Sequence, residues 1–432
     1  MPTIIGTPVV ASAPVASAVT RSTLRRLIAG SAGLNGIHVG VAQNGNATQS
    51  SDTLVDASAD GILDIAYDDD RFEGAWLYKC PHGTGAGYVA PELHRVASYS
   101  AANGAVSIGR NFASLPVSGV TEYEIHTHGI PVDTLHEAID WACDNTRSAR
   151  WYAIPGLVPD GDMQAIDLAS WGTPANATAG KVILPDEQRR VVRVSASSGG
   201  YLPSSAIATS AGRVMRLHAV VDPNAGSTCT LVAWDATASA PITITWSGTI
   251  TQATSGRTYL TGRIDVPTNC ASVVVRLVGS GDWHHVAVYD VAHREVALPE
   301  WMVPYEQSIV AVAYATGAGT TSAHDQLLVP IPTPPRPEGR WWRIDPATYP
   351  GMLMVTASAP HPRLASDDDA VCAGQVRQLT LGCLAYLYRV ATRPDTMDSA
   401  RFELARQQAS RDWQAMALWA NPLARHRPRW GS

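Results

Sequence analysis

The feature that most constrains the fold is a series of short apolar segments between about Asp186 and His293. They recur at intervals of roughly ten to sixteen residues, and residues that favour turns separate them. The segments are RVMRLHAVVD, CTLVAWDA, ITITWSG, TYLTGRIDV, ASVVVRLVG and HHVAVYDV. Such regular recurrence is typical of an antiparallel β-sandwich, which we predict for residues 186–298.

Shorter strand-like runs precede this region. HVGVAQ, TLVDA, AWLYKC, AVSIG and YEIH are separated by segments rich in Gly and Asn, which supply the positive φ angles that tight turns need. A helix over 135–146 follows, with Asp133 as its expected N-cap. We therefore predict a small β-rich domain ending in a helix over residues 36–150, and a connector rich in Gly and Pro over 151–185.

An arm and a short helix are predicted for residues 1–35. The arm is rich in Ala, Pro and Val, and the helix covers 20–34 with Ser22 or Thr23 as its cap. A helix this short is marginal alone in water, so it must dock on another surface. Its apolar face is expected to hold Leu24, Leu27 and Ile28, with Arg21, Arg25 and Arg26 on the other side.

The C-terminal part changes character. Residues 299–340 are read as a strand and a proline-rich strap (Pro330, Pro332, Pro334, Pro335 and Pro337) of extended polyproline geometry. Residues 341–432 are read as a helical region with a basic tail. The acidic triplet 367–369 is expected at the start of a helix that ends near Ala391, and Asp398 or Ser399 starts a second helix through Ala420. The predicted fold is thus multidomain and mainly β, with an N-terminal helix and a C-terminal αα-hairpin.

Composition narrows the class of protein. A chain of 432 residues is too long to fold around one ordinary hydrophobic core, so several domains are expected. Charged residues make up 16%, against about a quarter in most soluble proteins, which suggests that neighbouring molecules cover much of the surface. The net charge of −6 argues against a general nucleic-acid binder. The six cysteines show no CxxC pair, so reduced thiols are expected, and no apolar run is long enough to span a membrane.

No motif indicates catalysis. His126 and His128, with His136 and Glu137, have some metal-ligand character, but we interpret them as a strand that runs into a helix. The glycines of 83–87 lack the Lys of a phosphate loop and are read as a hairpin. Side chains in the acidic triplets 68–70 and 367–369 point apart, unlike a catalytic carboxylate pair. We therefore predict no catalytic residue, no metal, no cofactor and no enzymatic activity.

Aromatic residues of the predicted sandwich could bind sugar rings. Trp234, Trp246 and Trp283, with Tyr259 and Tyr289, could form a stacking surface, because aromatic faces suit the apolar face of a pyranose. Burial in the core is the ordinary alternative. Of the three tryptophans, Trp283 lies where a loop meets a strand and is the one that we expect to be exposed.

The basic tail holds Arg425, Arg427, Arg429 and Trp430. It could be solvated, could strap one subunit to the next, or could contact DNA phosphates without reading sequence.

Several stretches resemble virion proteins of tailed bacteriophages. STLRRLIAG, TLVDA and the segment ending in YEIHT resemble the leading region of such proteins, and Leu135–Ala142 resembles the helix that follows there. Residues 368–419 look like the helical segment of head–tail adaptor proteins, and the sandwich is similar to carbohydrate-binding modules inserted in exposed virion proteins.

The resemblance implies a structural protein of the phage neck. It implies a ring, possibly a dodecamer, that joins the portal protein to tail nozzle or fibre proteins, with possible contact to packaged DNA. Such a protein would assemble in the host cytoplasm and reside in the virion, without a membrane partner. The alternative is a tail fibre or receptor-binding protein whose sandwich binds host polysaccharide.

Overall fold

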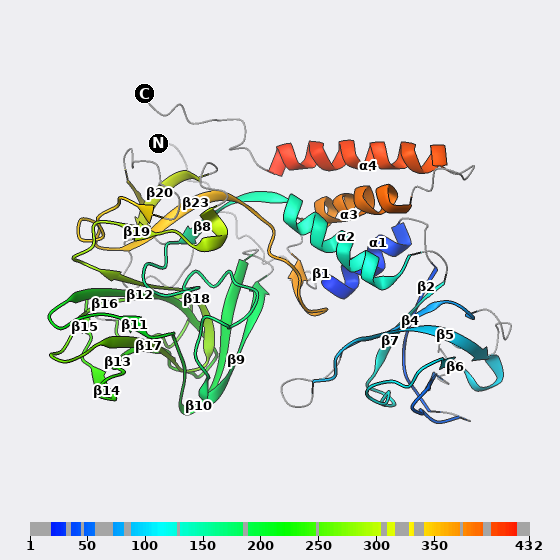
Figure 1. The fold of residues 1–432 in the computed structure, drawn as a ribbon, viewed down its shortest axis with the longest axis horizontal. Helices are drawn as coiled ribbons and strands as arrows, with labels where there is room; N and C mark the ends of the chain where they lie inside the picture. The colour runs from blue at the N-terminus through cyan, green and yellow to red at the C-terminus, as the bar shows by residue number, and fades with distance from the viewer. Residues whose placement is uncertain are drawn as a thin grey trace, which may run out of the picture. The chain divides into compact units, whose positions relative to one another are not determined.

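The computed structural model describes residues 19–31, 36–44, 47–56, 72–81, 88–127, 130–184, 189–247, 250–303, 309–315, 328–331, 341–371, 375–391 and 399–420. The chain divides into two compact units (Figure 1): unit 1 is Met1–Thr146 with Leu364–Met416, and unit 2 is Arg147–Arg363 with Ala417–Ser432. Over these described ranges the chain is mainly β, with four α-helices, which confirms the predicted fold class.

Unit 1 is built on a six-stranded antiparallel sheet in the order β2-β7-β4-β5-β6-β3. Alternating apolar side chains, among them Leu54, Leu77 and Ile125, fill its core with Phe72 and Tyr123. A separate pair joins β1 (Val19–Thr20) to β24 (Ala370–Val371). The sheet strands are β2 (Gly36–Val41), β3 (Thr53–Val55), β4 (Trp76–Lys79), β5 (Glu92–Ser100), β6 (Ala105–Ile108) and β7 (Glu122–Thr127), and the 3₁₀ turn η2 (Ala101–Asn103) links β5 to β6.

Helices α1 (Arg21–Ser31), α2 (Val132–Asn145) and α3 (Val376–Ala391) pack against one another in unit 1. Gly382 allows α3 to approach α2 closely, because a Cβ at this position would lie 3.1 Å from the Cβ of Ala142. Trp141 of α2 contacts Tyr386 of α3 and Trp413 of α4 (Ser399–Ala420), with ring centroids 5.6 and 5.2 Å apart. These aromatic rings hold the three helices together.

Two helix starts differ from the sequence prediction. In α1 the backbone N–H of Thr23 donates to Thr20 Oγ1 at 3.3 Å, so Thr20 takes the capping role expected of Ser22 or Thr23. Helix α2 starts at Val132, earlier than expected, after Pro131 with extended backbone and without a side-chain cap. Proline is well placed beside the first turn because no intrahelical partner exists there for its missing N–H.

The acidic triplet 367–369 does not start a helix. It forms a turn before β24, and α3 begins only at Val376. Asp367 is buried instead, and Asp369 accepts hydrogen bonds from the backbone N–H groups of Ala365 and Ser366. The buried side of α3 carries Leu379, Cys383 and Leu387.

Unit 2 contains the predicted β-sandwich, with two layers that share β10 (Arg189–Pro203). Residues 192–194 of β10 pair with β18, whereas residues 201–203 pair with β17 after a register shift. The middle sheet consists of β9 (Ala175–Leu184), the first part of β10, β18 (Gly281–Asp290), β12 (Val214–Pro223), β16 (Thr258–Asp265) and β15 (Thr245–Trp246). The outer sheet consists of the last part of β10, β17 (Ser272–Val278), β13 (Thr230–Asp235) and β14 (Ala240–Ile242), with β11 (Ile207–Ala208) beside β17.

The apolar core of the sandwich lies between these two sheets. Leu217, Leu260 and Val286 of the middle sheet meet Val275 and Leu277 of the outer sheet. Each of these residues alternates with neighbours that point away from the core, as the two-residue period of a strand requires.

A third layer covers the far side of the middle sheet (Figure 1). It is a four-stranded antiparallel sheet in the order β21-β20-β23-β8, and β19 pairs with β22 beside it. Val220, Ala287 and Tyr289 of the middle sheet pack with Ile154 and Leu353 in this second core. The strands are β8 (Arg147–Ala153), β19 (Val296–Ala297), β20 (Ile309–Ala315), β21 (Leu328–Pro330), β22 (Trp341–Trp342) and β23 (Met352–Pro360).

Hydrogen bonds of buried polar groups fix the position of this third layer relative to the sandwich. The Tyr289 hydroxyl donates to the carbonyl of Ile154 and accepts from the backbone N–H of Leu353, at 2.6 and 3.0 Å. The Tyr259 hydroxyl accepts from the backbone N–H of Met352 at 2.9 Å and lies 2.7 Å from Nδ1 of His218. A buried hydroxyl without partners would be costly, so these contacts favour one arrangement of the layers.

Candidate functional site

The two sandwich sheets differ in what covers their outward faces. The middle sheet is covered by the third layer, whereas outward residues of the outer sheet remain partly exposed. We call this surface the outer face, formed by Tyr201, Pro203, Val232, Trp234, Val274, Arg276 and Val278. Their inward neighbours Leu202, Leu231, Ala233, Val275 and Leu277 are buried. A partly exposed face with apolar and aromatic side chains is a candidate surface for a ligand.

Arg276 lies at the centre of the outer face between two aromatic rings. Strand register explains the arrangement: Arg276 pairs with Pro203 on one side and with Val232 on the other. Tyr201 and Trp234 are therefore its diagonal neighbours, within reach of a long side chain. The guanidinium carbon lies 4.3 Å from the ring centroid of Tyr201 and 3.4 Å from that of Trp234.

No described residue forms a hydrogen bond or an ion pair with the Arg276 side chain. Its Nε atom is buried and has no hydrogen-bond partner within the described part of the chain. Its two terminal nitrogens also have no hydrogen-bond partner among the described residues, and they are not buried. The outer face therefore presents two aromatic rings and one cation whose terminal N–H donors remain accessible.

The three tryptophans predicted from sequence do not share one surface. Trp234 is partly exposed on the outer face, whereas Trp246 packs against the sandwich core. Trp283 was expected to be exposed, but its side chain is 0% exposed. Its strand, β18, is buried on both faces: Trp283 belongs to the core between the two sandwich sheets, whereas Ala287 faces the third layer. Tyr259 and Tyr289 are buried between the middle sheet and the third layer.

Sequence reasoning missed Tyr201 and Arg276 as candidate ligand residues. The signal lay in ASVVVRLVG, where a single arginine interrupts an apolar strand at a position out of phase with the buried residues. Alternation places such a residue outward, but only the strand order shows which aromatic residues flank it.

Other expected sites lie outside the described residues. These are the basic tail (Arg425, Arg427, Arg429 and Trp430), the glycines of 83–87, the triplet 68–70, His128, and most of the proline strap. Among the residues that can be described, no group of three or more His, Cys, Asp or Glu is arranged to hold a metal. No described helix has both the length and the hydropathy needed to cross a membrane.

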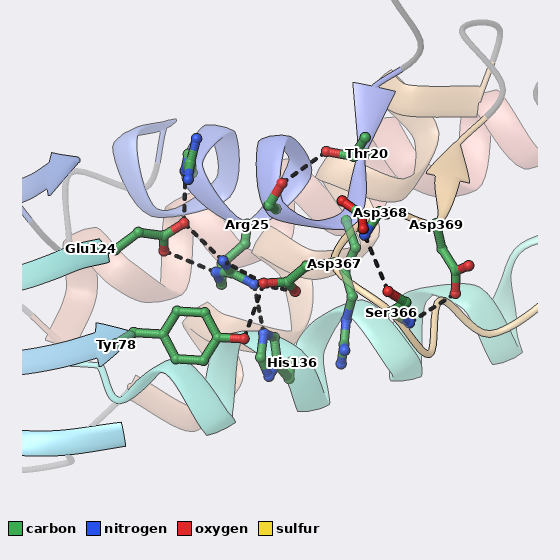
Figure 2. A network of polar contacts seen from close by, with 12 residues as sticks. Thr20, Arg25, Tyr78, Glu124, His136, Ser366, Asp367, Asp368 and Asp369 are labelled. Atoms are coloured by element: carbon green, nitrogen blue, oxygen red, sulfur yellow. Dashed lines mark hydrogen bonds and ion pairs between the residues drawn. The ribbon is translucent and has the colours of Figure 1, made fainter. Parts of the chain in front are cut away.

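His136, expected in a helix, belongs to a buried polar network of unit 1 (Figure 2). His126, expected at the end of a strand, joins this network because its Nε2 lies 3.0 Å from Glu124 Oε2. Arg25 is at the centre of the network, although the sequence placed this residue on the polar side of α1. Its Nε and Nη2 donate to the two carboxylate oxygens of Glu124 at 3.0 and 2.7 Å. Its Nη1 donates to Asp367 Oδ1 at 2.7 Å and lies 2.9 Å from Nε2 of His136.

The charged members of the network compensate one another, because Arg25 forms ion pairs with Glu124 and Asp367. Burial alone would lower the Arg25 pKa, but the pairs with Glu124 and Asp367 raise it overall. Burial would raise the Glu124 pKa, but hydrogen bonds from His126 and Arg25 lower it overall. Burial and the nearby arginines lower the His136 pKa to about 3, so its neutral ring can accept from Arg25. These residues connect α1, α2, β7 and the segment before β24, which is a structural role.

A cavity of about 440 Å³ lies in unit 2 between the segment that follows β8 and the segment 297–301. Asp160 and Asp162 line it, and both Asp160 and Met163 have positive φ angles of 54° and 63°. Gly161 lies against the middle sheet, because a Cβ there would meet the carbonyl oxygen of Val286 at 2.1 Å. In the sequence, the only sign of this cavity was the run Asp-Gly-Asp at 160–162, which lies in the segment read as a connector.

The carboxyl groups of this cavity are engaged by the protein. Asp160 accepts from Lys181 Nζ at 2.5 Å, from Trp171 Nε1 at 3.1 Å and from the backbone N–H of Ala165 at 2.8 Å. Asp162 accepts from Trp301 Nε1 at 2.5 Å. Burial and the nearby Asp160 raise the Asp162 pKa to about 7. Since these contacts already bind the carboxyl groups, the outer face is the better candidate site.

Comparison with known proteins gives no family. No family model matches the chain, and no curated protein matches it. Solved structures with partial similarity include the enzymatically active domain of bacteriophage CBA120 tailspike protein 4, at 13% identity and a TM-score of 0.24 over 32% of this chain and 22% of that one. The CBM22-1–GH10 modules of a Clostridium thermocellum endo-1,4-β-D-xylanase, solved with xylohexaose, show 12% identity and a TM-score of 0.25 over 35% of this chain and 31% of that one.

A xylan-binding domain from Paenibacillus barcinonensis is similar at 7% identity and a TM-score of 0.25, over 34% of this chain and 97% of that one. The chain thus spans about a fifth and a third of the length of the first two structures and nearly all of the third. TM-scores of this size do not establish a shared fold, so the outer face has to be judged on its own geometry.

Proposed function

We propose that this chain is a component of a tailed-phage particle whose β-sandwich binds polysaccharide on the host surface. The proposal adopts the receptor-binding alternative of the sequence analysis. It rests on the sequence resemblance to virion proteins and on the geometry of the outer face.

The observation that carries this proposal is the position of Trp234. Its ring is partly exposed on the outward face of the outer sheet, on the opposite side of Arg276 from Tyr201, and the inward neighbours of its strand are buried. A flat aromatic surface on a rigid sheet can stack against the apolar face of a pyranose at little entropic cost. The neighbouring Val232 and Val274 widen the apolar surface around the ring.

The neck-ring alternative depends on the terminal helices being buried against other copies. The apolar side of α3 already packs on α1 and α2 of its own unit. Most of the apolar side of α3 is therefore already covered within unit 1, and Val390 near its end remains exposed. The observations on α3 favour the receptor-binding alternative.

Replacement of Trp234 tests the proposal. We expect the full-length protein to bind at least one member of a panel of bacterial surface polysaccharides in affinity electrophoresis. Trp234→Ala should weaken that binding about tenfold or more, because it removes the stacking surface.

Trp341→Ala is the matched control, since Trp341 is a tryptophan of the same unit that is 56% exposed away from the outer face. Its affinity should stay within about twofold of the native value. Thermal unfolding of both variants excludes loss of the fold as the cause. Equal losses in the two variants, or no binding by the native protein, would overturn the proposal.

A further inference from the structure

The outer face holds a cation for which the described residues provide no counter-ion. Arg276 has no ion pair, and none of the outward positions of β13, β17 and the last part of β10 carries an Asp or a Glu. The whole chain is acidic, with a net charge of −6, so this is a local positive site on an acidic protein. Arg25, the buried arginine of unit 1, is by contrast paired with two carboxylates.

The two rings restrict how a ligand can reach Arg276. Tyr201 and Trp234 approach from the strands on either side of β17, so the guanidinium lies between them. Its Nε atom is buried, which leaves the edge with the terminal nitrogens as the accessible part. A planar anion that enters along this edge can accept two parallel N–H bonds, the geometry that guanidinium and carboxylate share.

We infer that the outer face selects polysaccharides whose sugar rings carry a carboxylate, with Arg276 binding the carboxylate while Trp234 or Tyr201 stacks on a sugar ring. This inference rests on the proposed function and adds the chemical class of the ligand to it. The ordinary alternative is that Arg276 only packs between the rings, a cation–π arrangement that contributes about 0.5–1 kcal/mol at exposed sites. In that case a neutral sugar would bind as well as an acidic one.

The experiment compares each acidic polysaccharide with its own methyl ester. Polygalacturonate, alginate, hyaluronate and polysialic acid are the probes, and esterification removes the charge while keeping the sugar ring. We expect the full-length protein to bind at least one acid, and to bind its ester about tenfold or more weakly, as loss of a charge-assisted hydrogen bond predicts.

Substitutions of Arg276 test whether this residue causes the preference for the acid over its methyl ester. Arg276→Met should bind acid and ester about equally, whereas Arg276→Lys keeps the charge without the planar donor pair and should retain part of the preference. Arg263→Met is the matched control, because Arg263 is an exposed arginine of the middle sheet with Asp265 as its partner. Trp234→Ala should weaken binding to both forms. Thermal unfolding confirms that each variant is folded.

The outcomes distinguish failure of carboxylate selection by Arg276 from failure of polysaccharide binding itself. If acid and ester bind the native protein equally, or if Arg276→Met keeps the preference, the inference is wrong while polysaccharide binding stands. If sulfated dextran binds but none of the carboxylated probes does, Arg276 selects another anion and the inference is also wrong. If no acidic, esterified or neutral polysaccharide binds, both the inference and the proposed function are wrong.

Discussion

At the scale of single residues, the positive charges of two arginines in apolar surroundings are stabilised by different partners. Arg25 is fully buried and satisfied by two carboxylates that lie 99 and 342 residues away in the sequence. Arg276 remains partly exposed between two aromatic rings. Periodicity alone placed Arg25 on the polar side of its helix, since the spacing of apolar residues contains no information about distant partners.

Asp162 provides a prediction about pH. Its folded-state pKa is raised from 3.8 to about 7 by burial and by Asp160, so the folded state holds its proton more tightly than the unfolded state does. The free energy of unfolding should therefore fall as pH rises from about 4 to 7. Asp162→Asn should remove this fall while keeping an oxygen for Trp301. Unfolding by urea at several pH values measures the effect.

The stabilisation by Asp162→Asn should be near zero below pH 4 and reach about 1–4 kcal/mol above pH 7. Asp265→Asn, on the exposed end of β16, controls for the change of one unit of charge. A stabilisation that is equal at pH 4 and pH 8 would contradict the assignment of the effect to the Asp162 proton.

At the scale of elements, the two C-terminal helices differ in how they are stabilised. Leu379 of α3 is 0% exposed, whereas Leu404 of α4 is 66% exposed. Leu379→Ala should lower the free energy of unfolding by about 2–5 kcal/mol, because it leaves a cavity where α3 packs in unit 1. Leu404→Ala should change it by less than about 0.5 kcal/mol.

Urea unfolding followed by circular dichroism compares these two identical substitutions. Similar losses would show that α4 is buried as deeply as α3 in solution. If Leu404→Ala leaves the isolated protein unchanged but abolishes its incorporation into particles, α4 contacts a partner there, and the neck-ring alternative regains support.

The strands themselves were easier to predict than the layers that cover their two faces. The two-residue period in HHVAVYDV and its neighbours correctly predicted strands and the sandwich. The same period could not show that β18 is covered on both faces, because the covering strands β23 and β8 lie far away in the sequence. Trp283 is buried on the other face of β18, in the core between the two sandwich sheets.

At the scale of the whole molecule, the two units differ in how the chain builds them. Apart from the last residues of α4 (417–420), the structure described for unit 2 lies in the continuous segment Arg147–Arg363, whereas unit 1 combines Met1–Thr146 with Leu364–Met416. A fragment of residues 147–363 should therefore fold alone, unfold cooperatively and keep the polysaccharide affinity of the full chain. A fragment of residues 1–146 should not fold, because it lacks α3 and the Asp367 partner of Arg25.

Circular dichroism melts and affinity electrophoresis of the two fragments check this prediction. Adding residues 364–416 to the first fragment through a short linker should restore cooperative unfolding. A cooperative transition in residues 1–146 alone, or none in residues 147–363, would show that the units depend on each other for folding.

The sequence by itself indicated most strands of the sandwich and the approximate positions of the four helices, because alternation and helical spacing are local properties of the chain. It did not indicate β9, which lies in the segment read as a connector. Only the tertiary structure decided which outward residues stay accessible, because that depends on what other layers cover. It buried Trp283 between the two sandwich sheets and left Trp234 on the uncovered face of the outer sheet, and it brought Tyr201 and Trp234 to the two sides of Arg276. Strand order, which no local pattern encodes, made these side chains neighbours.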